Sequence, residues 1–229
     1  MRLLLVAATL PETALLCERL DLHRQGALWQ GRAGAWEIDL LITGVGMVNT
    51  AFTLGRYLAA QRPDLAINVG IAGTFDREMA LGTVVEVVSD FFPELGAESP
   101  EGFLDMEALG FPVLETVTQR WPGGLNNPSP SLLEIPKVSG ATVNTVHGVP
   151  ESISALLARC RPQVETMEGA AFFHAMLASG VPFLAFRGIS NYVEPRNRAA
   201  WQIGPALRQV QELLCEALMA PPATLVNSI

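Results

Sequence analysis

Continuous apolar runs alternate along this chain with segments whose apolar residues recur at helical spacing. A short apolar run is typical of a strand buried on both faces, whereas apolar residues three and four positions apart mark one face of a helix. Strands are therefore predicted at 3–8, twice within 27–43, and at 65–73, 84–89, 137–148, 164–166 and 182–191. Helices are predicted from Pro11, over 47–61, from Pro150 to about 161, after Glu168 and over 199–219.

The order of these elements predicts a single α/β domain over residues 1–229, a three-layer α/β/α sandwich around a mixed central sheet. Strands alternate with helices, and no linker or repeat divides the chain. Residues 90–136 are irregular and rich in Pro and Gly, which predicts a long excursion over one sheet edge, as a lid or an oligomer contact. Residues 220–229 are expected to form a loose tail.

The composition allows a sizeable core and narrows the range of partners. Of the 229 residues 49% are hydrophobic, and the net charge is −8. The 15 basic residues form no cluster, so a nucleic-acid partner is not expected. No apolar run reaches about 18 residues, so no membrane span is expected. Residues 1–10 superficially resemble a signal peptide, but Pro11 interrupts them early, and secretion is not expected.

Cysteine and histidine are scarce and widely spaced: Cys17, Cys160, Cys215, His23, His147 and His174. An odd number of distant cysteines argues against a disulfide framework and for a reducing compartment, which predicts a cytoplasmic protein. Neither residue type has the spacing of metal ligands, so no metal site and no cofactor are predicted.

Polar side chains stand at the predicted ends of buried strands: Glu12, Glu168, Arg187 and Asn191. Open α/β sheets bind their ligands at this edge, and convergent polar groups are what a small-molecule site requires. Glu168 has a second interpretation, because a glutamate at a helix start is common and is favoured by the helix dipole. Arg187 lies within an apolar run, so it should meet a carboxylate or a ligand.

Two glycine-rich stretches follow predicted strands, at 43–46 and 68–73. Each is explained either by close approach of the backbone to a ligand or by a plain tight turn, and the residues leave that choice open. A bare G-x-G is a weak signal for phosphate, and neither a third glycine nor a Walker lysine accompanies it here.

Taken together, these segments resemble the nucleoside phosphorylase superfamily, in particular its methylthioadenosine and adenosylhomocysteine nucleosidases, and most of all the futalosine hydrolases. Nearly the whole chain follows the family order. The resemblance rests on Glu12, on 43–46, on 68–73, on Met167-Glu168-Gly169-Ala170, on Arg187-Gly188-Ile189-Ser190-Asn191, and on 189–198, which is similar to futalosine hydrolases in particular.

The resemblance implies an enzyme that breaks an N-ribosidic bond with water. In the futalosine hydrolases that bond belongs to futalosine, hypoxanthine and dehypoxanthine futalosine are released, and the pathway is menaquinone biosynthesis. By resemblance Glu12 activates the water, and Glu168 binds the ribose hydroxyls and favours the positive charge of the transition state. Met167 would pack on the sugar. Arg187 would orient the water and hold the two carboxylates, which otherwise raise each other's pKa.

The resemblance implies further substrate contacts at Ile71, Gly73, Thr145, Val146 and Ser190. The backbone of 143–147 would lie beside the purine base. His147 itself could contact the ligand, although a lone histidine at a strand end is more often structural.

Two positions depart from the nucleosidase pattern. Asn191 stands where the nucleosidases have an Asp; an amide can donate toward N7 and O6, which favours hypoxanthine over adenine as the leaving base. Ile71 stands where the family has a Ser in a turn that phosphorylases use for phosphate. A branched apolar side chain cannot donate a hydrogen bond, which argues against a phosphate site.

Three alternatives to the futalosine reaction stay open at this point. One is a 6-oxopurine nucleoside phosphorylase, recognisable by its dependence on phosphate. Another is a nucleosidase for methylthioadenosine, adenosylhomocysteine or aminofutalosine. The third is a nucleoside-binding protein without catalysis, against which both Glu12 and Glu168 argue. Relatives associate, so a homo-oligomer, a dimer or larger, is expected.

Overall fold

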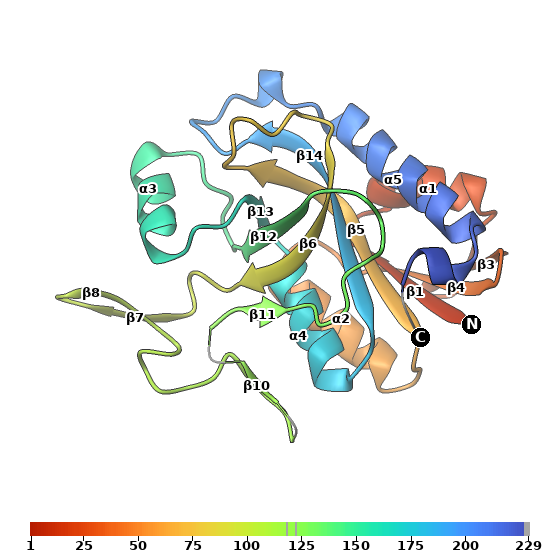
Figure 1. Ribbon diagram of the computed structural model, residues 1–229, viewed down its shortest axis with the longest axis horizontal. Coiled ribbons are helices and arrows are strands. Elements are labelled where there is room, and N and C mark those ends of the chain that lie inside the picture. Colours follow the sequence, from red (N-terminus) through yellow and green to blue (C-terminus); the bar gives the residue numbers. More distant parts are fainter. Residues whose placement is uncertain (118, 122, 227–229) are drawn as a thin grey trace.

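The computed structural model describes residues 1–117, 119–121 and 123–226, and these build a mixed sheet with helices on both faces (Figure 1). The strands are β1 Arg2–Ala7, β2 His23–Gln25, β3 Leu28–Ala33, β4 Trp36–Ile42, β5 Leu65–Thr74, β6 Val84–Phe91, β7 Gly96–Ser99, β8 Gly102–Asp105, β9 Leu114–Glu115, β10 Arg120–Trp121, β11 Leu125–Asn126, β12 Lys137–Thr142, β13 Val164–Thr166 and β14 Phe183–Tyr192. The α-helices are α1 Ala14–Arg19, α2 Met47–Leu58, α3 Pro150–Arg159, α4 Gly169–Ser179 and α5 Ile203–Met219. Short 3₁₀ turns are η1 Leu10–Thr13, η2 Arg198–Ala200 and η3 Pro222–Thr224.

The sheet is mixed, as the sequence predicts. β1 pairs in parallel with β4 and β5, whereas β13 runs antiparallel to β5 and β14 antiparallel to β6. β14 also pairs with β5, and β12 pairs with both β6 and β13. Five strands, β5, β14, β6, β12 and β13, therefore close into a ring, which is not foreseeable from the sequence. The ends of β5, β13 and β14 are thereby brought close together.

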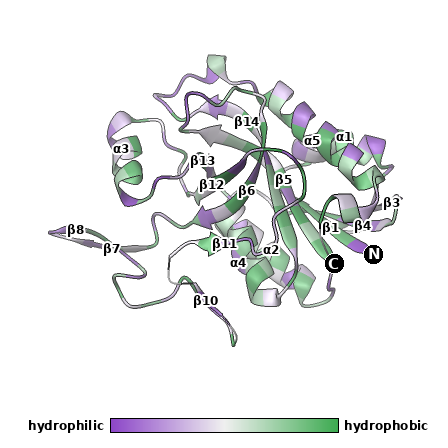
Figure 2. Cartoon of the chain, in the orientation of Figure 1, coloured by the Kyte–Doolittle hydropathy of each residue, from purple (hydrophilic) through white to green (hydrophobic). Residues whose placement is uncertain are grey.

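Two hydrophobic cores lie on opposite faces of the sheet, which confirms the three-layer sandwich. Along β1, Leu3 and Leu5 join the core under α1 and α5, while Leu4 and Val6 join the core under α2 and α4. Side chains alternate across a strand, so a continuous apolar run is what a strand covered on both faces requires. Figure 2 shows the central strands mostly hydrophobic, with hydrophilic colour on the outer surfaces of the helices.

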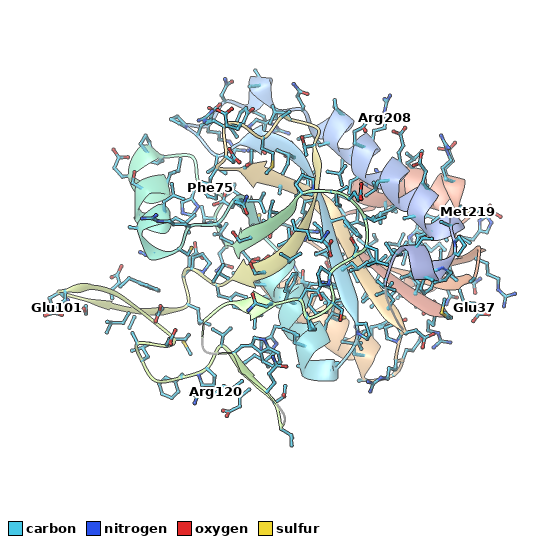
Figure 3. All side chains as sticks on the ribbon, in the orientation of Figure 1. Glu37, Phe75, Glu101, Arg120, Arg208 and Met219 are labelled. Carbon is cyan, nitrogen blue, oxygen red and sulfur yellow. The ribbon has the colours of Figure 1, made fainter. Side chains whose placement is uncertain are left out.

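The excursion at 90–136 contains more strand than its composition predicts. β7 and β8 form an antiparallel hairpin that extends away from the body of the molecule, with Glu101 at its tip (Figure 3). β9 pairs with β10, and β11 adds to the edge of the main sheet beside β6. The role of this excursion as a lid or an oligomer contact stays a prediction.

Two expected boundaries are wrong. Strand β12 ends at Thr142, and residues 143–148 form a loop instead of continuing the strand to Gly148. Two backbone N–H groups of this loop bond to side chains: that of Asn144 donates to Glu94 and that of His147 to Glu165, at 3.1 and 2.9 Å. Helix α5 begins at Ile203 and not at residue 199, because the 3₁₀ turn η2 occupies Arg198–Ala200.

The expected loose tail is packed through residue 226. Leu225 is fully buried and Val226 nearly so, and both belong to the core under α5. The tail is held because η3 turns the chain back after α5 and the backbone N–H of Leu132 donates to the carbonyl of Leu225 at 2.9 Å. Residues 227–229 of that prediction lie outside the described residues. No helix in the described part of the chain is long and apolar enough to cross a membrane.

Candidate active site

A pocket of about 330 Å³ opens where the chain leaves β1, β5, β13 and β14. This volume is in the range of small-molecule sites. The pocket brings together most of the residues that the sequence singles out: Glu12, Ile71, Gly73, Val146, Met167, Glu168, Ser190 and Asn191. Two predicted residues lie outside its lining, Arg187 in the interior and Thr145 on the exposed side of the 143–148 loop.

Apolar groups make up much of the wall. Ile71, Met167 and Val146 were expected there, whereas Trp201, Ile203 and Leu207 were not. Trp201 precedes α5, and Ile203 and Leu207 lie in its first turns; the apolar positions of this segment predict only a helix packed on the core. A second hollow of about 850 Å³ lies between the 91–124 excursion and α3, and it contains none of the predicted site residues.

Glu12 is held by the turn that follows β1. Its Oε2 accepts hydrogen bonds from the backbone N–H and the hydroxyl of Thr9, at 2.8 and 3.0 Å. Its Oε1 lies against Gly70, where a Cβ atom would come within 2.7 Å of it. Burial and the neighbouring Glu168 raise the pKa of Glu12, against the lowering effect of the Thr9 bonds and of Arg187. One fixed oxygen and one unbonded oxygen are what a positioned proton acceptor needs.

Glu168 stands at the N-cap position of α4, but its side chain makes no cap bond to that helix. Its Oε1 instead accepts the backbone N–H of Gly46 at 2.9 Å, across the pocket from β13. Gly46 has a φ of +94°, a conformation that favours glycine. The glycine-rich turn at 43–46 thus positions a carboxylate of the pocket, which supports the ligand interpretation over simple helix capping.

Arg187 is 2% exposed, and its partners differ from the predicted carboxylate or ligand. Its guanidinium donates to the side-chain oxygen of Asn68 and to the carbonyls of Asn68 and Phe186. No carboxylate in the described part of the chain lies within 4 Å of it. Burial lowers the pKa of Arg187, and the charges of Glu168, Glu12 and Asp90 oppose that effect. The arginine therefore acts on both pocket carboxylates through space.

Asp90, at the end of β6, is a buried carboxyl that the sequence analysis missed. Its Oδ1 accepts hydrogen bonds from Thr142 Oγ1 and from the backbone N–H of Phe91, both at 2.9 Å. Its Oδ2 has no partner among the described residues and lies against Gly169, where a Cβ atom would come within 2.1 Å. Burial raises the pKa of Asp90 to about 7, despite these bonds and the charge of Arg187.

We expect Asp90→Asn to change how stability depends on pH. A carboxyl whose pKa rises on folding, here from 3.8 to about 7, stabilises the fold fully below pH 3.8, and this contribution is lost as the pH rises to about 7. At about 1.4 kcal/mol per pH unit the loss amounts to about 4 kcal/mol. The amide keeps the bonds at Oδ1 without the charge. Urea unfolding at pH 5 and pH 8 should therefore show the variant gaining stability over the wild type at pH 8. An equal difference at both pH values would contradict this.

Asn191 lies near the end of β14, and its amide orientation is fixed by neighbours. Its Oδ1 accepts the hydroxyl of Ser190 at 2.8 Å, and its Nδ2 donates to the carbonyl of Tyr192 at 3.0 Å. A Cβ atom at Gly73 would come within 3.0 Å of Nδ2, so the glycine provides the space that this amide occupies. One N–H of the amide is then left to meet a ligand in the pocket.

His147 and Glu165 form a pair in the pocket wall. Nδ1 of His147 makes a short hydrogen bond to Oε2 of Glu165. The sequence favoured a structural role for His147 over a ligand contact. It gave no reason to single out Glu165, because a glutamate inside a short strand gives no signal of which partner it meets. Among the described residues no three acidic, histidine or cysteine side chains gather closely enough to hold a metal ion.

Comparisons with known proteins agree with this geometry. The family model described as Phosphorylase superfamily matches residues 2–220. A futalosine hydrolase of Streptomyces coelicolor is 36% identical over 204 residues, covering 86% of this chain and 81% of its own. One from Thermus thermophilus is 34% identical over 198 residues, covering 82% and 85%.

The fold also matches solved structures. A methylthioadenosine/adenosylhomocysteine nucleosidase from Colwellia psychrerythraea 34H, solved in complex with adenine, superposes with a TM-score of 0.80 at 20% identity, covering 100% of this chain and 97% of its own. The family-model match and the identity to the two hydrolases extend over most of the chain. The chain therefore belongs to the phosphorylase superfamily and, within it, to the family of the futalosine hydrolases.

Proposed function

We propose that this protein hydrolyses the N-ribosidic bond of futalosine and releases hypoxanthine and dehypoxanthine futalosine, as a step of menaquinone biosynthesis. The observation that carries the proposal is that Glu12 and Glu168, which are far apart in the sequence, line one pocket of about 330 Å³ together with Asn191. The curated relatives named futalosine hydrolase, at 34 and 36% identity, support this choice of substrate.

The chemistry follows from the two carboxylates. As the C1′–N9 bond breaks, its electron pair goes to the purine and positive charge develops on the ribose. Glu168 places negative charge beside the ribose, where it favours this transition state. The unbonded oxygen of Glu12 takes a proton from water, whose oxygen then bonds to C1′. The positive charge of Arg187 lowers the pKa of Glu12, against burial and the charge of Glu168, which raise it.

Water is favoured over phosphate as the nucleophile. No lysine or arginine is among the described residues that line the pocket, whereas three glutamates are. An anion entering this pocket would meet negative charge without a paired cation, which is costly in a desolvated site. Ile71 also offers no hydroxyl in the turn where a phosphorylase would bind phosphate. These features argue against one of the alternatives, a 6-oxopurine nucleoside phosphorylase.

The test is to incubate the protein with futalosine, aminofutalosine, inosine and methylthioadenosine, with and without phosphate, while free base is measured. The proposal expects hypoxanthine from futalosine at the same rate with or without phosphate. Ribose 1-phosphate that appears only with phosphate would support the phosphorylase instead. Release of adenine from methylthioadenosine as the fastest reaction would support the nucleosidase alternative.

Asn191→Asp should weaken the preference for futalosine over aminofutalosine. The amide N–H suits the acceptors N7 and O6 of hypoxanthine, but faces the exocyclic amine of adenine donor against donor. A protonated aspartate at this position carries one O–H, which can donate to N7 while its other oxygen accepts from the amine. A mispaired buried polar group costs about 1–3 kcal/mol, or roughly 5- to 150-fold.

The measurement is kcat/KM for both substrates with both proteins, and Asn126→Asp, on the exposed edge strand β11, is the matched control. An unchanged substrate ratio in Asn191→Asp would show that Asn191 does not read the base.

A cytoplasmic location, a single domain and a homo-oligomeric state remain part of this proposal. Light scattering of the purified protein tests the last of these.

A further inference from the structure

The function proposed above leaves the departing purine without an acid. Negative charge grows on the base as the C1′–N9 bond breaks, and a proton donated there lowers the barrier. Asn191 cannot supply that proton, because an amide does not ionise near neutral pH. Among the described residues that line the pocket, the only side chain other than the glutamates that exchanges protons in this range is His147.

Glu165 is bound at both carboxylate oxygens by this one histidine. Oε1 accepts the backbone N–H of His147 at 2.9 Å, and Oε2 makes the short hydrogen bond to Nδ1. The side chain of Glu165 is 3% exposed and that of His147 12% exposed, so the histidine is the member of the pair that reaches the opening. Nε2 has no partner among the described residues and is the ring nitrogen left for a ligand.

The charge of the pair determines what Nε2 can do. A buried pair is most stable when it is electrically neutral. Neutrality is reached either with a carboxylate and an imidazolium, or with a protonated carboxyl and a neutral ring whose proton is on Nε2. In both descriptions Nε2 carries a proton and can donate it. Removal of one proton leaves the pair with a charge of −1 and turns Nε2 into an acceptor.

We propose that His147 is the general acid that protonates the departing purine, with Glu165 as its positioning residue. This inference rests on the proposed function. The Nε2 proton moves to O6 or N7 of the purine, which share the developing negative charge. Nδ1 keeps the proton shared with Glu165, so the charge of −1 moves from the purine to the carboxylate. Together with the proton that Glu12 takes from water, atoms and charge balance, and exchange with solvent resets both groups.

Most of the charged side chains around the pair are acidic. Glu94 lies close enough to raise the pKa of Glu165, although burial is the larger cause. Glu12 and Glu168 line the same pocket. Arg196 lies beside the 143–148 loop: its backbone N–H bonds to the carbonyl of Gly148, and its guanidinium lies over the ring of Trp201. Burial and the charge of Glu94 thus raise the pKa of Glu165, against the lowering effect of its hydrogen bonds to His147.

The test is the pH profile of kcat and kcat/KM for futalosine with the wild type, His147→Gln, Glu165→Gln and His23→Gln. His23 is exposed in β2 and serves as the matched control. The wild type should give a bell, with an acid limb from Glu12 and an alkaline limb from the His147–Glu165 pair. His147→Gln should lower kcat by about 100- to 10,000-fold, lose the alkaline limb and keep the acid limb, with little change in KM.

Glu165→Gln should lose less activity and move the alkaline limb to lower pH, because the ring then gives up its proton without a carboxylate beside it. Thermal unfolding of each variant confirms that it is folded, and His147→Asn replaces His147→Gln if that variant is not. A folded His147 variant with the wild-type alkaline limb, or with an effect on KM alone, would overturn the inference while leaving the hydrolase intact. A wild type that releases no base from any nucleoside would overturn the proposed function itself, and the inference with it.

Discussion

Replacing Glu12 with Gln should lower the turnover of futalosine by about 100- to 10,000-fold, the usual contribution of a general base. The amide can still accept the two bonds from Thr9 through its oxygen, so the side chain keeps its position. What is lost is the oxygen facing Gly70, which becomes an NH2 group and cannot take a proton from water. Substrate affinity should change little, because the oxygen that is lost acts on the nucleophile and not on the nucleoside.

The pH profile gives this prediction a second readout. Burial raises the pKa of Glu12. As the pH is lowered, the wild-type rate should therefore begin to fall at a higher pH than it would with an ordinary glutamate. That acid limb should be absent in Glu12→Gln. Glu18→Gln, on the exposed side of α1, is the control and should behave as the wild type. Wild-type turnover in a folded Glu12→Gln protein would remove Glu12 from the mechanism.

The fold was largely predictable, since each buried strand of the sheet carries its own apolar run. β1, β5 and β14 are largely apolar and buried on both faces, as expected of strands that helices cover on both sides, whereas β7 and β8 contain no fully buried residue. The ring closed by β13 and β14 was not predictable. Two residues of β13 pair antiparallel with β5, and all three pair in parallel with β12, and such pairing depends on contacts far apart in sequence.

The position of a site residue was predictable where its side chain follows a strand. It was less predictable where it depends on a hydrogen-bond partner distant in the sequence. Glu12, Glu168 and Asn191 each stand at a strand end, and strand ends meet at one edge. Arg187 was expected to meet a carboxylate or a ligand because an isolated buried charge is costly, yet the amide oxygen of Asn68 accepts its hydrogen bond. The pairing of His147 with Glu165 depends on where the 143–148 loop turns, and no local pattern reveals that.

The same distinction applies to Glu168, whose position the sequence explained equally well as a helix cap or as a ribose ligand. In the structure its carboxylate makes no bond to its own helix and reaches Gly46 instead. A side chain at the N-cap position that accepts no hydrogen bond from the helix contributes little to the stability of that helix. The negative charge in the pocket then has to be explained by what the pocket binds.

Glu168→Gln should therefore lower kcat/KM for futalosine by about 100- to 1,000-fold, comparable to the loss of one preorganised electrostatic group. The amide oxygen can still accept the N–H of Gly46, so the turn at 43–46 and the helix start should be preserved. What is lost is the negative charge beside the ribose as its positive charge develops, and one acceptor for its hydroxyls.

Single-turnover kinetics and equilibrium binding separate these two effects: the former should show slower bond cleavage, and the latter weaker binding of the nucleoside. Glu151→Gln provides the control, because Glu151 also stands in the first turn of a helix but is exposed and outside the pocket. If Glu168→Gln lowered thermal stability and left the kinetics intact, the glutamate would be a structural residue. Equal stability with slow cleavage is the result that the bond to Gly46 predicts, because that bond positions the charge without requiring it.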